Sequence, residues 1–282
     1  MKQEQFDALD LHYSPCRYGM SRQYFRGPKK SLDGAYVACV GGTATYGKFI
    51  DQPFPARLER ALGRVCVNFG SVNGGVDAFI NDPTIMKACA QAQMTVVQVM
   101  GANFLSNRFY SVHPRRNDRF LRASSVMQAV FPEVDFSDFT FTRHMLGSLF
   151  EKSPARFDIV VSELRDAWVA RMRNMLGQIG PNAVLLWFSS ERLDNTPWDQ
   201  RDAGLAADPL FISAAMIDNL RPLVRDVVVV RPSLAARNRG THGMFFSSHQ
   251  RQAASEMLGL ASHKEATDAL LSALRPLLPP VT

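Results

Sequence analysis

The sequence lacks several features that assign a chain to a class at first sight. It has 4 cysteines among 282 residues, and no two of them form a Cys-x-x-Cys pair, which argues against a zinc site or a dithiol redox centre. No apolar run reaches the length of about 18 residues that a membrane span needs, and the first residues lack the apolar core of a signal peptide. We therefore expect a cytoplasmic protein with no membrane span.

Motifs for cofactors and nucleic acids are absent as well. The chain contains no HExxH pair, EF-hand loop, Walker phosphate loop or GxGxxG, so we expect neither a metal nor another cofactor. The net charge is +6, but basic residues are mixed with acids except at 26–30 and 113–116. Nucleic-acid-binding surfaces usually show a basic stripe interleaved with aromatics. We expect no nucleic-acid partner, and the charge slightly favours an anionic substrate.

The composition is that of an ordinary globular protein, with 46% hydrophobic and 21% charged residues. The length suits one α/β domain with an insertion as well as it suits two small domains. We predict a single domain over residues 1–282, with a wrapping segment at 1–34 and an inserted segment at 104–155. Nothing in the composition argues against a homo-oligomer.

Alternating strand and helix patterns predict a doubly wound parallel sheet of about five strands. Several apolar runs are almost continuously aliphatic, as in strands that are buried on both faces. The predicted strands are 36–41, 64–69, 95–100, 183–188 and 226–231. The predicted helices are 53–62, 83–91, 156–176, 209–224, 247–258 and 263–278.

The inserted segment interrupts this alternation and is rich in aromatic residues and arginine. We interpret residues 107–120 as a loop that leads into a short helix. Long excursions from the carboxyl end of a strand are more often functional than idle. The segment is therefore predicted to be a lid or an interaction surface.

Three predicted strands end in small polar residues, in the blocks Gly41-Gly-Thr43, Asn68-Phe-Gly70 and Gly101-Ala-Asn103. Ligands of open α/β sheets bind at the carboxyl ends of the strands. The Thr43 hydroxyl, the Gly70 amide and the Asn103 carboxamide are therefore expected to converge at one edge. A simpler interpretation is a tight turn capped by Thr43, with asparagines bonded to loop backbone.

The order of these blocks, followed by the late His242, resembles the SGNH (GDSL-type) hydrolase superfamily, over residues 35–110 and 225–258. The whole chain is similar to a bacterial family of unassigned function. The resemblance implies a flavodoxin-like, three-layer fold and hydrolysis or transfer of a small or carbohydrate-like acyl ester. It implies Thr43 as the nucleophile, His242 as the base, and Gly70 and Asn103 as the oxyanion hole, in which one donor is worth about 3–4 kcal/mol.

The chain departs from the superfamily pattern at three positions. Gly42 replaces the aspartate of the first block, Thr43 replaces serine, and Arg239 replaces the triad aspartate three residues before His242. A cation beside His242 disfavours the imidazolium that a general base must form. Another acid then has to orient His242, for which the candidates are Asp194, Asp199 and Asp202. The alternative is a catalytically degenerate binding or scaffold protein that keeps the fold.

A second candidate site lies in the inserted segment. Arg108, His113, Arg115 and Arg116 are predicted to bind a negatively charged group of the substrate. They also support a further alternative, a transferase that recognises a phosphate or sulfate. The competing interpretation is a solvated turn in which Asp118 pairs locally with its neighbours.

Overall fold

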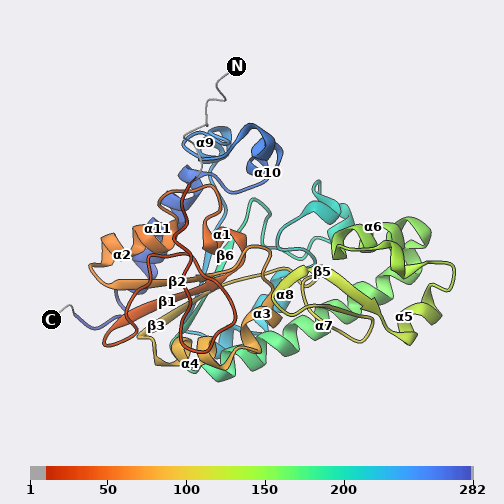
Figure 1. Cartoon of the computed structure of the whole chain (residues 1–282), viewed down its shortest axis with the longest axis horizontal. Helices are drawn as coiled ribbons and strands as arrows, with labels where there is room; N and C mark the ends of the chain where they lie inside the picture. Colours follow the sequence, from red (N-terminus) through yellow and green to blue (C-terminus); the bar gives the residue numbers. More distant parts are fainter. Residues whose placement is uncertain (1–10, 281–282) are drawn as a thin grey trace, which may run out of the picture.

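A parallel sheet of five strands forms the centre of the molecule (Figure 1). The computed structural model describes residues 11–280. The strands are β1 (Tyr36–Gly41), β2 (Val65–Gly70), β3 (Met94–Gln98), β6 (Ala183–Phe188) and β7 (Asp226–Val230). Their order is β2-β1-β3-β6-β7, and each neighbouring pair is parallel. The predicted α/β fold is confirmed, and every predicted strand lies within two residues of an observed one.

Helices cover both faces of the sheet, because successive residues of a strand point to opposite sides. Val37 and Cys39 of β1 pack in one core with the helices of the first face, and Ala38 and Val40 pack in the other. The first face carries α2 (Phe54–Leu62) and α11 (Leu260–Leu274), and the second carries α3 (Val76–Ile80), α4 (Pro83–Gln91) and α7 (Pro154–Ile179). Figure 1 shows this three-layer arrangement, with α2 and α11 above the sheet and α4 and α7 below it.

Local capping residues explain why the helices of these layers start and end near the predicted positions. α2 ends at Gly63, whose φ of +64° suits glycine. The Asp82 carboxylate accepts the backbone N–H groups of Thr84 and Ile85 and caps α4. α7 starts two residues before its predicted start, because Ser153 provides its N-cap. Within residues 11–280, no helix is both long and apolar enough to cross a membrane.

One predicted helix is wrong, and another is shorter than predicted. Residues 209–224 form only short α8 and a 3-10 turn, because Phe211 has a φ of +67° and Pro222 cannot continue a helix. Residues 247–258 form a 3-10 turn and short α10. The short helices are α1 (Thr43–Tyr46), α5 (Ser125–Val130), α6 (Thr142–Lys152), α8 (Ala214–Asp218), α9 (Leu234–Asn238) and α10 (Arg251–Ser255). The 3-10 turns are Phe136–Asp138, Trp198–Gln200, Gly204–Ala206, Arg221–Leu223 and Ser248–Gln250.

The inserted segment contains a β-hairpin where the sequence predicted a loop and a short helix. Its strands are β4 (Tyr110–His113) and β5 (Arg116–Ala123), and they pair antiparallel. Tyr110 and Val112 are buried while Ser111 is only half-buried, which is the period of a strand and not of a helix. Figure 1 shows β5, α5 and α6 together at one end of the molecule, beyond the sheet and along α7.

The described part of the N-terminal segment lies against β2. Cys16 and Phe25 pair through their backbones, and the Phe25 ring packs edge-on against Phe69 of β2 at 5.3 Å between centroids. The Arg26 guanidinium donates to the carbonyls of Gly47 and Asp51. The first ten residues of the predicted wrapping segment lie outside the described residues.

A buried histidine joins α11 to α2. His263 is 1% exposed, and its Nδ1 accepts the backbone N–H of Phe54 at 3.1 Å. This acceptor satisfies an N–H of the first turn of α2, which has no side-chain cap of its own. Burial, and then the nearby charges of Arg57 and Arg26, lower the pKa of His263 to about 3. His263 therefore stays neutral at physiological pH.

We expect His263 to make the fold sensitive to acid. The unfolded chain binds a proton at His263 below a pH of about 6.5, whereas the native protein does so only near its lowered pKa. The free energy of unfolding should therefore fall as pH decreases through this interval, by up to about 1.4 kcal/mol per pH unit. Urea unfolding of His263→Gln should show lower stability than wild type at pH 7 and a weaker decline toward pH 4.5. The exposed His249→Gln is the control, and an unchanged decline in His263→Gln would contradict the assignment.

Candidate functional site

A small cavity opens at the carboxyl ends of β1 and β3. These strands flank the point where the strand order reverses, and open α/β sheets bind ligands at such points. The cavity has a volume of about 20 Å³, which is room for about one water-sized group. Its lining residues are Gly42, Thr43, Asn73, Gly74, Gln98, Met100, Gly101, Phe104 and Asp208.

Hydrogen bonds from two strands hold α1, which carries Thr43, at this cavity. The Gln98 side-chain oxygen accepts the N–H of Thr45 at 3.0 Å and its hydroxyl at 2.6 Å. The Asn68 amide of β2 donates to the Thr45 carbonyl at 2.8 Å. A Cβ at Gly41 would lie 2.2 Å from the Thr45 hydroxyl oxygen, so only glycine fits at the end of β1. Thr43, the first residue of α1, is therefore held in place at the cavity.

The Thr43 hydroxyl is bonded to Asn73. It accepts the Asn73 backbone N–H at 2.9 Å and donates to the side-chain oxygen of Asn73 at 3.3 Å. Asn73 has a φ of +55°, a left-handed conformation that asparagine tolerates. Its side-chain N–H donates to the buried Asp118 carboxylate at 3.1 Å. A polar chain therefore runs from Thr43 through Asn73 to Asp118, and the sequence had not singled out Asn73.

Gly70 does not line the cavity. Its N–H donates to the Asn68 side-chain oxygen at 2.8 Å, so this amide already has a partner. A Cβ at Gly70 would lie 2.1 Å from the backbone nitrogen of Tyr46, which explains the glycine by packing against α1. The interpretation of Asn68 as a residue that bonds to loop backbone is confirmed. Gly74, in the loop after β2, lines the cavity instead.

Asn103 lies directly behind the cavity wall. It is fully buried, and neither its side-chain oxygen nor its side-chain nitrogen has a hydrogen-bond partner among the described residues. A Cβ at Gly101, which lines the cavity, would lie 2.5 Å from that oxygen. The absence of a side chain at Gly101 therefore leaves room for the Asn103 carboxamide beside the cavity. Leaving a buried polar group unpaired costs about 1–3 kcal/mol.

His242 is not among the residues that line the cavity. It is exposed in the turn after α9, and its backbone N–H donates to the Arg239 carbonyl at 2.9 Å. Of the acids considered for it, Asp194 accepts from Arg201 at 2.9 Å and lies 3.0 Å from Arg192. Within residues 11–280, no hydrogen bond or ion pair joins His242 to Thr43 or to these acids.

The basic residues of the inserted segment bind different partners and do not form one anion site. Arg108 pairs with Glu163 at 3.0 Å, and Arg115 donates to a backbone carbonyl at 3.4 Å. Arg116 lies 3.5 Å from the carboxylate of Asp118, the local pairing that the sequence had left open. His113 accepts the backbone N–H groups of Arg115 and Arg116 and closes the turn of the hairpin.

Asp208 is the cavity residue that the sequence did not reveal. It lies in the segment predicted as loop and helix after β6, and no motif surrounds it. Its side chain is 64% exposed, and one carboxylate oxygen lies 3.7 Å from the Arg143 guanidinium of α6. Burial raises the pKa of Asp208 and Arg143 opposes this change. Because the carboxylate remains accessible to water, we expect a modest rise.

A larger cavity of about 300 Å³ lies between the N-terminal segment and α2. Three of its charged residues are used within the fold, because Lys30 pairs with Glu59 at 2.7 Å and Arg26 is bonded to backbone carbonyls. Within residues 11–280, no three His, Cys, Asp or Glu side chains gather as a metal site would require. The cavity at β1 and β3 is therefore the stronger candidate.

Comparison with known proteins places the chain in a family but not in a functional class. Residues 1–278 match a family described as a domain of unknown function, DUF6473. The chain belongs to this family. No curated protein matches the chain. Among solved structures, a lipase, Lip_vut3 from goat rumen metagenome, matches 85% of this chain and 97% of its own, with 11% identity and a TM-score of 0.42.

The close approach of α1 to β2 predicts a large cost for a methyl group at Gly70. Gly70→Ala should lower the free energy of unfolding by about 1–3 kcal/mol or more, because the added carbon meets backbone that cannot move freely. Gly177→Ala in α7 is the matched control, since a Cβ there meets no atom within 4 Å. That change should raise stability by about 0.5–1 kcal/mol. Equal effects in urea unfolding would contradict the packing argument.

The unpaired carboxamide of Asn103 predicts an unusual response to an apolar substitution. Asn103→Leu, of similar shape, should leave stability unchanged or raise it, because it removes two buried atoms without partners. Asn117→Leu is the comparison, since Asn117 accepts the N–H groups of Gly75 and Ala78 and donates to the His113 carbonyl. That variant should lose several kcal/mol, at about 1–3 kcal/mol per orphaned group. Thermal unfolding that ranks Asn103→Leu as low as Asn117→Leu would show that Asn103 is paired.

Proposed function

We propose that this protein hydrolyses or transfers the acyl group of a small or carbohydrate-like acyl ester, with Thr43 as the nucleophile. The observation that carries the proposal is the position of the Thr43 hydroxyl. It lies on the wall of a narrow polar cavity at the switch point of the sheet, on a helix that two strands hold in place. A threonine hydroxyl forms an acyl intermediate when a base removes its proton.

Asn103 supports the same chemistry. A developing oxyanion needs a hydrogen-bond donor that is already in place and not engaged elsewhere. The Asn103 carboxamide is buried and unpartnered within the described residues, and its side-chain oxygen lies beside Gly101 of the cavity wall, so that a flip of the carboxamide would place its N–H group there. In the proposed reaction it donates to the carbonyl oxygen as negative charge develops there. The Gly70 amide has no part in this scheme, because Asn68 occupies it.

The size of the cavity limits the acyl group. Room for about one water-sized group admits a carbonyl oxygen or a methyl group but not a long chain, so the proposed acyl group is a short one such as acetyl. Met100 and Phe104 supply apolar wall on which a methyl group would pack. The alcohol part of the ester then lies outside, where size is less restricted. A carbohydrate-like alcohol is compatible with this arrangement.

A binding or scaffold role is the second candidate, and one observation favours it. The Thr43 hydroxyl is bonded to Asn73 and not to a base, and His242 lies on an exposed turn. In this alternative the cavity binds a small polar group without reaction. The two roles differ in what a change at Thr43 does.

Substitution of Thr43 separates these candidates. With p-nitrophenyl acetate as the substrate, Thr43→Ser should keep or raise kcat/KM, because it retains the hydroxyl and removes the crowding methyl. Thr43→Ala should reduce turnover to the background rate and abolish any fluorophosphonate adduct, detected by peptide mass spectrometry. The exposed Thr140→Ala serves as the control. Turnover in Thr43→Ala equal to wild type would exclude Thr43 as the nucleophile, and an inert wild type would favour the binding role.

A further inference from the structure

The lining of the cavity contains a single ionisable side chain. Of its nine lining residues, only Asp208 carries an ionisable side chain, while Thr43, Asn73 and Gln98 are neutral and the others are glycine or apolar. Thr43 and Asp208 therefore share the walls of a space that is only about one water molecule wide. The resemblance assigned the base to His242, which lies outside this lining.

The backbone on both sides of Asp208 is held in place. The Ser189 hydroxyl, directly after β6, donates to the Asp208 carbonyl, and Arg143 donates to the carbonyl of Ala207 at 3.1 Å. Past the aspartate, the Leu210 carbonyl accepts the N–H of Ala102 at 3.0 Å. Ala102 lies between Gly101 of the cavity wall and Asn103. The segment that carries Asp208 is thus fastened to the end of β6 and to the loop after β3.

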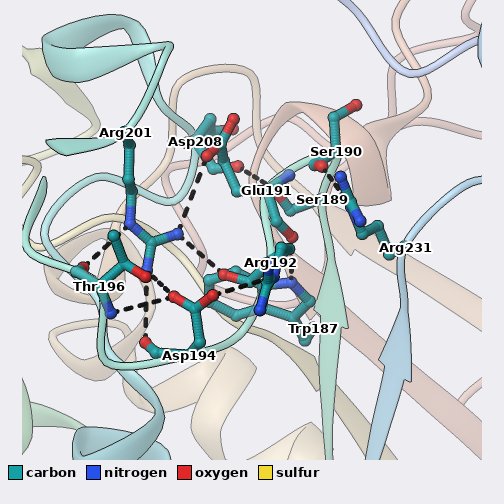
Figure 2. Close-up of polar contacts among 10 residues, drawn as sticks. All are labelled: Trp187, Ser189, Ser190, Glu191, Arg192, Asp194, Thr196, Arg201, Asp208 and Arg231. Carbon is teal, nitrogen blue, oxygen red and sulfur yellow. Dashed lines mark hydrogen bonds and ion pairs between the residues drawn. The ribbon is translucent and has the colours of Figure 1, made fainter.

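Arg201 bonds to several residues of the loop that follows β6, which begins at Ser189, as Figure 2 shows. The Arg201 guanidinium, 9% exposed, donates to the Arg192 carbonyl at 2.8 Å and to the Asp194 carboxylate at 2.9 Å. The backbone N–H of Glu191 in turn donates to the Ser189 hydroxyl oxygen at 2.9 Å. These bonds fix the backbone that carries Asp208. A group that takes part in a reaction has to be held in place in this way.

We infer that Asp208 is the general base for Thr43, in place of a histidine. The inference rests on the proposed function and names a further catalytic residue for it. Arg143 of α6 is a positioning residue, because its guanidinium lies 3.7 Å from one Asp208 oxygen. The arrangement also accounts for Gly42 and Arg239 at the motif positions, since neither has to supply an acid.

The reaction balances with these groups and water. Asp208 accepts the hydroxyl proton as the Thr43 oxygen attacks the ester carbonyl carbon, and the carbonyl electron pair moves to the oxygen near Asn103. When the tetrahedral intermediate collapses, the alkoxide leaves and takes the proton from Asp208. Water then attacks the acyl-threonine and gives a proton to Asp208. The second collapse releases the carboxylic acid and returns the proton to Thr43.

A raised pKa suits this role. A base is most effective when its pKa lies close to the working pH. Burial raises the pKa of Asp208, and the charge of Arg143 prevents a larger rise. Because only the carboxylate accepts a proton, activity should fall as pH decreases through the pKa of Asp208. Among the described lining residues no other group titrates there, and Arg143 is the charged group paired with Asp208.

The test is the pH profile of kcat/KM for p-nitrophenyl acetate in wild type and Asp208→Asn. Asp208→Asn keeps the backbone bonds of the segment and should lower kcat/KM by about 10²–10⁴-fold, with loss of the acidic limb of the profile. Asp208→Glu should restore part of the rate. Thermal unfolding checks that each variant is folded. Asp218→Asn, an exposed acid paired with Arg221 at 2.8 Å, is the matched control and should behave as wild type.

Four other outcomes would overturn the inference. If Asp208→Asn is as active as wild type while Thr43→Ala is inactive, the proposed function stands and Asp208 is not the base. The same holds if His242→Ala removes the acidic limb and Asp208→Asn does not, or if Asp208→Asn is slower but keeps that limb. If wild type neither turns over the ester nor forms a fluorophosphonate adduct, the proposed function fails and the inference fails with it.

Discussion

The hydrogen bonds that fasten the first turn of α1 to its neighbouring strands determine where Thr43 lies. Gln98 of β3 accepts two bonds from Thr45, and Asn68 of β2 donates to the Thr45 carbonyl. These bonds form only because α1 lies almost in contact with the strand ends, and that closeness depends on glycine at the ends of β1 and β2. The candidate site is therefore a consequence of how closely a short helix packs on a parallel sheet.

The buried Asn103 differs from buried polar side chains that are fully hydrogen-bonded. Asn117 uses three hydrogen bonds to hold the loop before α3, and Asp77 accepts from Ser106 and Arg171. Asn103 is buried as deeply but is unpartnered in the part of the chain that the structure describes. Among the described residues, Asn103 is the buried side chain for which both polar atoms lack a partner, whereas Gln23 and Asp118 each leave one oxygen unpaired. This contrast, together with the position of Thr43, directs attention to the cavity at β1 and β3.

The cavity is assembled from segments that lie far apart in the chain. The loops after β1, β2 and β3 supply most of its wall, and the segment after β6 supplies Asp208. The hydrogen bonds of Ser189 and Arg201 hold that segment (Figure 2). The Asp208 carboxylate and the Thr43 hydroxyl therefore belong to segments that follow different strands. The inserted hairpin contributes through Asp118, which supports Asn73 from behind. Arg116 lies beside the same Asp118 carboxylate, whereas Arg108 pairs with Glu163.

The sequence by itself determined the strands, the class of fold and the placement of Thr43 at the sheet edge. Aliphatic runs, helix caps and the glycines after strands are local signals, and they act over a few residues wherever the chain goes. Tertiary structure alone decided that Gly70 packs against α1 and that His242 is exposed. It also decided that Arg108 and Arg116 pair with different acids and that Asp208 lines the cavity. The hairpin at 110–123 and the short turns at 209–224 also escaped the local signals. Each of these outcomes depends on contacts between distant segments, and such contacts are set by the packing of helices on the sheet and not by neighbouring residues.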